Sequence, residues 1–244
     1  SKLFSELILN HSEIKKVNFK NFSKNNSYIS ILLSDIEFNS KYFETASSSS
    51  FILEKEKQFP YSVSHFKASN RKRIRKNIKK FLNYEYKLVN SNNLEFPIKI
   101  LVRLRDYMLK KGSRDIDFLN DDMIKTINDL YDNHLIDISM VSYKNEVKSI
   151  IIIFKKQNSY QLWISLYMEI PHISVFTINS FLKSISSKKD IRIDLGRGLY
   201  RFKIMNYAPT ILPLYEFYFS KNNLDYFIFI FIKILKTTLK KLLK

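Results

Sequence analysis

Cysteine is absent from the 244 residues of this chain. Disulfide bonds, thiolate metal sites and cysteine nucleophiles are therefore excluded together. Histidine is scarce as well: the chain has four, and none stands in an HxxxH or HExxH spacing. Because zinc sites need clustered imidazole or thiolate ligands, we expect no metal site.

Only three glycines occur, Gly112, Gly196 and Gly198. A phosphate-binding P-loop needs two glycines in the pattern GxxxxGK, and a dinucleotide fingerprint needs three in the pattern GxGxxG. The three glycines here stand in neither pattern, so both kinds of nucleotide fold are excluded. The most apolar segment, Tyr226–Leu235, is far shorter than the roughly 20 residues that span a bilayer. The start of the chain lacks a basic leader followed by an apolar run. We expect a cytoplasmic protein, soluble or peripheral to the inner face of the cell membrane.

Positive charge, in contrast, is abundant, with a formal net charge of +18. Residues 67–80 hold eight Lys and Arg residues and no acid, and residues 233–244 hold five Lys and no acid. Such a charge distribution attracts phosphate groups, whether on a coenzyme, a nucleotide, RNA or an anionic lipid surface.

Hydrophobic residues make up 45% of the chain, which is enough for a packed core. Apolar periodicity predicts a basic helix after residue 67 and an extended segment over Tyr42–Leu53. From residue 84 onward the predicted strands are 84–89, 135–143, 147–154, 160–167, 191–195 and 209–219, and the predicted helices are 97–111, 120–134, 174–187, 199–206 and 222–243. Asn120 and Ser174 are the expected N-caps. This order predicts a mixed α/β sheet with flanking helices, in which 147–154 is covered on both faces.

A local motif gives a more specific indication. Residues 193–198 read Ile-Asp-Leu-Gly-Arg-Gly and are followed by Phe202-Lys203, while an arginine-rich stretch, Ser69–Lys76, lies upstream. Together with His172–Val175 and the element order, this resembles GNAT-superfamily acyltransferases, in the branch of cellulose and exopolysaccharide biosynthesis acetyltransferases related to Fem-type transferases. The resemblance implies a partial N-terminal lobe (1–60), a GNAT-like acyltransferase domain (61–221) and a basic amphipathic C-terminal helix (222–244).

The resemblance also implies a coenzyme site between strands 160–167 and 191–195, which diverge in these enzymes. Backbone groups of the first strand would pair with the pantetheine arm, and N–H groups at the start of the next helix would hold the pyrophosphate. The residues expected at acetyl-CoA are Trp163, Ile164, Ser165, Ile173, Ser174, Val175, Phe176 and Thr177, with Lys183, Lys188 and Lys189 near the adenosine phosphate.

For the chemistry, Asp194 and His172 are candidate bases, and Tyr207 or Tyr200 is a candidate proton donor to the departing thiolate. The candidate substrate-binding residues are Arg197, Lys203, Arg71 and Arg75. We expect Asp194 and Lys203 to line the cleft rather than the core.

Each of these residues also has an ordinary structural interpretation. Asp194 can cap the turn at Gly196, Trp163 and Tyr207 fit a core, and a single loop histidine such as His172 is often incidental. Arg197, Lys203 and the basic stretch 67–80 fit a solvated surface.

The function implied is transfer of an acyl group from acyl-CoA to an amino sugar, nucleotide-linked, in bacterial surface polysaccharide biosynthesis. One alternative is a Fem-like transferase that uses aminoacyl-tRNA, although residues 67–80 lack the interleaved aromatics of many RNA-binding segments. Another is a peripheral membrane or scaffold protein. Its basis is the C-terminal segment, where Phe227, Phe231, Ile234 and Leu235 lie beside Lys233, Lys236, Lys240 and Lys241.

Overall fold

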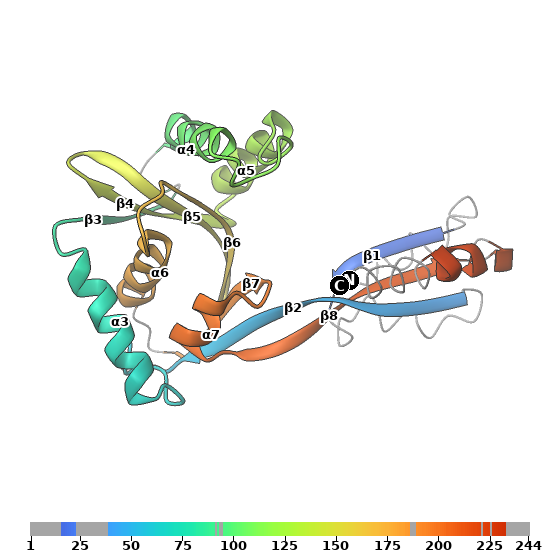
Figure 1. Cartoon of the computed structure of the whole chain (residues 1–244), viewed down its shortest axis with the longest axis horizontal. Coiled ribbons are helices and arrows are strands. Elements are labelled where there is room, and N and C mark those ends of the chain that lie inside the picture. The colour runs from blue at the N-terminus through green and yellow to red at the C-terminus, as the bar shows by residue number, and fades with distance from the viewer. Residues whose placement is uncertain are drawn as a thin grey trace. The chain divides into compact units, whose positions relative to one another are not determined.

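The structure is a computed structural model, and it describes residues 16–22, 39–90, 92, 95–185, 189–220, 222–224 and 226–232. The chain forms two compact units, one of residues 49–210 and one that combines residues 1–48 with 211–244. The elements are β1 (Lys16–Phe22), β2 (Asn39–Leu53), α3 (Ala68–Lys80), β3 (Glu85–Val89), α4 (Ile98–Lys110), α5 (Asp121–Asp132), β4 (Ile136–Tyr143), β5 (Glu146–Lys156), β6 (Ser159–Tyr167), α6 (Ile173–Ser184), β7 (Ile191–Arg197), α7 (Arg201–Tyr207) and β8 (Thr210–Ser220) (Figure 1).

In the larger unit the strands follow the order β2-β7-β6-β5-β4-β3, with β2 contributing its last residues. Strands β3 to β6 form an antiparallel meander, and β7 pairs with β6 in parallel. Every element predicted from residue 84 to the end of β8 is present close to its predicted bounds. The predicted mixed α/β sheet with flanking helices is confirmed.

Helices cover both faces of this sheet. Figure 1 shows α4 and α5 on one side of the strands and α3 and α6 on the other. Alternate residues of β5 enter the two cores: Ile151 and Ile153 pack on the side of α3 and α6, whereas Ile150 and Ile152 pack on the side of α4 and α5. The run Ile150–Ile153 is therefore buried on both faces of the sheet, as the near-continuous β-branched sequence predicts.

The helix starts test the two predicted N-caps. Asn120 is the N-cap of α5, where its side-chain oxygen accepts a hydrogen bond from the Met123 N–H at 2.9 Å. The prediction for Ser174 is wrong: α6 begins one residue earlier, its N-cap is His172 with a left-handed φ of 71°, and Ser174 lies in the first turn. The cap prediction rested on residue type, whereas a left-handed backbone at His172 directs the chain into the helix. Of the predicted helix end, residues 186–187 lie outside the described residues.

In the smaller unit the strand order is β1-β8-β2, and β1 pairs with β8 in antiparallel register. Residues 226–232 are helical, as predicted, and residues 233–244 lie outside the described part of the chain. Among the described helices, none has the length and hydropathy that crossing a bilayer requires. The division at residues 60/61 and 221/222 stays a prediction, as does the partial N-terminal lobe.

Candidate functional site

Strands β6 and β7 diverge soon after they pair. Ser159 pairs with Arg192, Tyr160 with Ile193, and Gln161 with Asp194, and the register of the parallel pair ends there. The backbones of the two strands are still in close contact just after these pairs, because a Cβ built on Gly196 would lie 2.6 Å from the carbonyl oxygen of Leu162. Only glycine fits this approach. Beyond this contact β6 continues to Tyr167 without a paired residue in β7, so the predicted divergence of the two strands begins after Leu162 and Gly196.

Beyond the divergence, β6 keeps one backbone edge directed away from β5. The N–H of Met168 donates to the carbonyl oxygen of Lys148 at 2.9 Å, so residue 168 bonds toward the β5 side. Since bonding direction alternates along an antiparallel strand, the N–H and C=O groups of Ser165 and Tyr167 point to the side from which β7 has departed. These groups are positioned to pair with an extended ligand.

A register shift in the β5–β6 pair lies at the same place. Ile152 pairs with Ile164 and Ile153 with Leu162, so Trp163 is an extra residue in β6. The Trp163 side chain is 36% exposed, and its ring centroid lies 4.7 Å from that of Phe154. The interpretation of Trp163 as a core residue is therefore wrong: its side chain lies at the surface, between the buried Leu162 and Ile164. Ile164, the next predicted coenzyme residue, is buried.

The start of α6 offers backbone groups rather than side chains. The side chains of Ile173, Val175, Phe176 and Thr177 are buried, and Ser174 is half-buried. The Thr177 hydroxyl lies 2.9 Å from the Ser149 hydroxyl. Any contact of these residues with an anion must therefore run through backbone N–H groups. The Ile173 N–H donates to the carbonyl of Ile170 at 3.1 Å and the Phe176 N–H to that of His172 at 3.0 Å, so the candidate donors are the N–H groups of Ser174 and Val175.

Asp194 stabilises the turn that ends β7. Its Oδ1 atom accepts a hydrogen bond from the Gly196 N–H at 2.7 Å. Gly196 and Gly198 have φ angles of 76° and 91°, in the left-handed region that favours glycine. The ordinary capping role of Asp194 is thus present. This hydrogen bond occupies one carboxylate oxygen, Oδ1.

Lys203 lies beneath this turn. Its Nζ atom donates to the carbonyl oxygens of Gly196, Arg197 and Gly198 at 3.0, 3.0 and 3.1 Å. The side chain is only 6% exposed. Burial lowers the pKa of Lys203 to about 8, an effect that the charge of Asp194 partly opposes. The expectation that Lys203 lines a cleft is wrong, since its three donor hydrogens are directed at backbone carbonyls of the turn.

Tyr207 is a core residue. It is fully buried, its ring stacks on Phe51 at a centroid distance of 5.8 Å, and burial raises the pKa of its hydroxyl. That hydroxyl donates to Oδ1 of Asn179 at 2.8 Å, and Asn179 in turn donates to Asn77 at 2.8 Å. Neither asparagine was predicted as a site residue. The sequence feature that could have indicated them is an amide side chain on the apolar face of each helix.

The Asn77 amide donates to the backbone carbonyl of His172 at 3.4 Å. The hydrogen-bonded series that starts at Tyr207 thus ends at the N-cap of α6. The His172 side chain itself is exposed. His172 thus lies at the surface and Tyr207 in the core, and Asn179 and Asn77 connect the Tyr207 hydroxyl to the His172 backbone carbonyl.

The predicted arginines lie on two elements. Arg71 and Arg75 are on α3, where the Arg71 guanidinium lies 5.6 Å from the centre of the Tyr61 ring and Arg75 donates to the Tyr61 hydroxyl at 3.2 Å. Arg197 is exposed at the end of β7, and its guanidinium makes no hydrogen bond or ion pair with another described residue. The structure thus brings Asp194, Arg197 and Lys203 to one turn, with the α3 arginines in a separate cluster.

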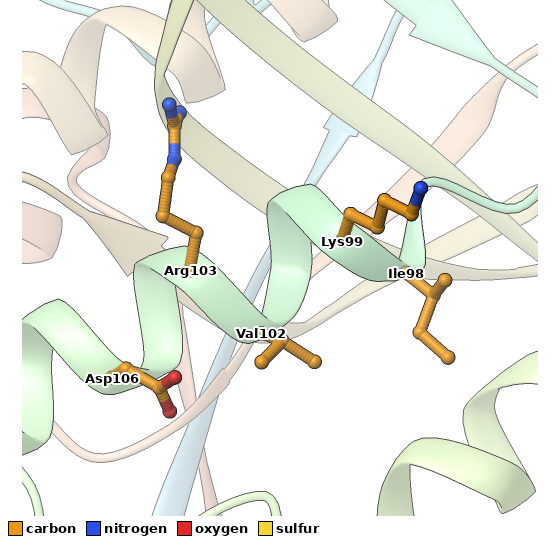
Figure 2. Close-up of a pocket in the computed structure, with 5 residues that line it drawn as sticks. All are labelled: Ile98, Lys99, Val102, Arg103 and Asp106. Carbon is orange, nitrogen blue, oxygen red and sulfur yellow. The ribbon is translucent and has the colours of Figure 1, made fainter.

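Two other findings concern metal ligands and pockets. The described residues contain no group of His, Asp and Glu side chains that could hold a metal ion. A pocket is present on α4, lined by Ile98, Lys99, Val102, Arg103 and Asp106, as Figure 2 shows. None of these five belongs to the predicted site.

No protein-family model matches the sequence, and no curated protein is significantly similar to it. Solved structures are similar in fold. The C-terminal domain (DUF2156) of a candidate lysylphosphatidylglycerol synthetase from Agrobacterium fabrum has a TM-score of 0.63 at 11% identity, over 92% of this chain and 75% of that one. L-PGS from Bacillus licheniformis has a TM-score of 0.58 at 13% identity, over 85% and 68%. FemX has a TM-score of 0.56 at 9% identity, over 89% and 75%.

At these identities the similarities show the fold, which the chain shares with Fem-type and lysylphosphatidylglycerol synthetase-type structures. The relation to Fem-type transferases that the motif predicted therefore holds at the level of fold. The cellulose and exopolysaccharide branch stays a prediction.

Proposed function

We propose that this protein is an acyltransferase whose acyl donor binds where β6 and β7 diverge. The observation that carries the proposal is the backbone edge at Ser165 and Tyr167, which faces the side that β7 has left. A pantetheine arm carries two amides and binds as an added strand would. The donor we propose is acetyl-CoA or another acyl-CoA, with its pyrophosphate at the N–H groups of the first turn of α6.

The reaction is attack of an acceptor amine on the thioester carbonyl carbon. A C–N bond forms, the C–S bond breaks, one proton leaves the amine and the coenzyme thiolate takes up a proton. Asp194 is the proposed base, because its carboxylate lies at the last paired residue of β7, beside the turn at Gly196. Tyr207 is too deeply buried to protonate the thiolate, whereas Tyr200 is 58% exposed on the same turn and is the better candidate.

The acceptor we propose is an amino sugar, carried on a nucleotide, in the synthesis of a surface polysaccharide. The sequence motif supports this class of acceptor, and the exposed guanidinium of Arg197 offers a contact for an anionic group. Arg197 takes the substrate-binding role expected of Arg197 and Lys203 together, since the Lys203 ammonium donates to three backbone carbonyls of the turn.

A matched pair of substitutions at one position tests donor binding. Ser165→Pro removes the N–H that the pantetheine would bond, and it removes no bond to β5 because this N–H points away from that strand. Ser165→Ala keeps the N–H and removes only the hydroxyl. Isothermal titration with acetyl-CoA should show wild-type affinity for the alanine variant and a loss of about tenfold or more for the proline variant.

Absence of heat with both acetyl-CoA and CoA at high protein concentration would reject the coenzyme assignment. If Ser165→Pro melts much below the wild type, the same contact can be read in the wild-type protein. The amide resonance of Ser165 should then shift, and its hydrogen exchange should slow, when CoA is added.

A second candidate is transfer of an aminoacyl group from tRNA. Its support is the similarity in fold to FemX and the row of exposed basic side chains on α3, Lys72, Arg73, Arg75, Lys76, Lys79 and Lys80. No described acid forms an ion pair with any of them. Binding of charged tRNA that persists at about 0.2 M salt, with no binding of CoA, would favour this donor over the first.

A further inference from the structure

The helical residues 226–232 have an inner face that packs on their own unit. The Phe229 ring stacks on Tyr218 with centroids 3.9 Å apart and an interplanar angle of 7°. The Tyr226 hydroxyl donates to the carbonyl oxygen of Ser40 at 3.3 Å. Tyr226 and Phe229 thus hold these helical residues against the rest of the smaller unit.

The outer face of the same residues is apolar and exposed. Phe227 is 65% exposed, Ile228 48%, Phe231 68% and Ile232 42%. At about 100° per residue these four side chains fall within an arc of roughly 140°. Leu224, just before them, is 66% exposed. An exposed apolar surface of this kind marks an interaction site in a soluble domain.

The sequence after residue 232 continues the pattern and adds positive charge. Apolar residues recur at the helical spacing of the outer face, at Ile234, Leu235, Leu239, Leu242 and Leu243. Lysines lie between them, at Lys233, Lys236, Lys240, Lys241 and Lys244, and no acidic residue follows Asp225. A wide apolar arc bordered by lysine alone is the pattern of a helix that lies in the interface of an anionic membrane.

We propose that this face, which we call the 227/231 face, binds the surface of an anionic lipid bilayer. Phe227 and Phe231 enter the boundary between headgroups and acyl chains, and the lysines contact the phosphates of anionic lipids. Charge decides between a bilayer and a second copy of the chain. A chain with a net charge of +18, whose last twelve residues include five lysines and no acid, is attracted to an anionic surface and repelled by a second copy of itself.

The test is co-sedimentation of the full chain with lipid vesicles. Binding is expected to phosphatidylcholine vesicles that contain about one third phosphatidylglycerol, and it should weaken about tenfold or more on pure phosphatidylcholine or at about 0.5 M salt. The double variant Phe227→Ser and Phe231→Ser should reduce binding to the anionic vesicles at least about tenfold. Ile116→Ser and Leu82→Ser are matched controls, since these residues are 87% and 75% exposed in the larger unit and should leave binding unchanged.

Three outcomes would overturn the proposal: no binding to anionic vesicles, equal binding by the double variant, or a vesicle-independent dimer that the double variant abolishes. If the double variant does not fold, Phe231→Trp gives a second readout, because its emission should shift to the blue and be quenched by brominated lipid only when anionic vesicles are present. Acetyl-CoA titration of the same variants separates this proposal from the acyltransferase proposal, since the 227/231 face and the β6–β7 site belong to different units.

Discussion

Replacing Lys203 by Met removes the ammonium from the turn at the end of β7 and keeps a side chain of similar length. Three carbonyl oxygens, those of Gly196, Arg197 and Gly198, then lose their donor. A hydrogen bond to a charged group contributes about 1.5–3 kcal/mol, but the ammonium is itself costly to bury, so we expect a net loss of about 2–4 kcal/mol. For a chain of this size, that lowers the Tm by roughly 5–15 °C.

The same variant has a defined pH dependence. In the folded protein burial lowers the pKa of Lys203 to about 8, whereas a lysine in the unfolded chain has a pKa of about 10.4. Between these values the unfolded chain binds more protons at this site than the folded chain. The free energy of unfolding of the wild type should therefore rise with pH relative to that of the variant, by up to roughly 3 kcal/mol, while below pH 8 the difference stays constant.

Thermal and urea unfolding of both proteins between about pH 7 and pH 10 measure this difference. Lys79→Met, at an exposed position on α3, is the control and should melt with the wild type. If Lys203→Met melts within about 2 °C of the wild type at pH 7, the turn does not depend on the ammonium. Lys203 would then be available to a substrate, as the sequence motif first implied.

Other substitutions test the same turn and its surroundings. Asp194→Asn should lower the rate of acyl transfer at least about 10²-fold with little change in Tm, because the amide oxygen still accepts the Gly196 N–H; unchanged turnover would remove Asp194 as the base. Gly196→Ala should lower the free energy of unfolding by more than about 2 kcal/mol, since its Cβ would lie 2.6 Å from the Leu162 carbonyl oxygen. Gly112→Ala, also at positive φ but with open space around it, should lower it by about 1 kcal/mol. Equal losses in chemical denaturation would refute the contact. Tyr207→Phe should lose about 1 kcal/mol with its hydrogen bond and keep the wild-type rate, and a large fall in rate at unchanged stability would return Tyr207 to the catalytic candidates.

Much of the fold could be read from local sequence pattern. The order of elements from β3 to β8 follows from apolar periodicity, since helices and buried strands repeat their apolar residues at different spacings. The turn after β7 could also be located, because Gly196 and Gly198 are two of only three glycines in the chain. The run of isoleucines in β5 predicted a strand with cover on both faces, and its residues do enter two cores.

The site was less accessible to this reasoning. The core interpretation of Trp163 rested on residue type, whereas the folded β5–β6 pair, which has a register shift at this residue, leaves the side chain 36% exposed. The sequence does not pair Asn179 with Asn77, because their hydrogen bond forms only when α6 packs on α3. A one-residue error at the start of α6 had a similar cause, since the left-handed φ of His172 depends on the loop that enters the helix.

Lys203 shows most clearly what the sequence by itself determined and what tertiary structure decided. The sequence determined that a lysine follows a strand-ending pair of glycines, with a carboxylate just before them. Only the folded chain decided which way the lysine points, because three carbonyls of the turn accept hydrogen bonds from its ammonium and the side chain is almost fully buried. A motif fixes the order of chemical groups along the chain, whereas the burial of each group and its partners depend on which distant segments pack against it.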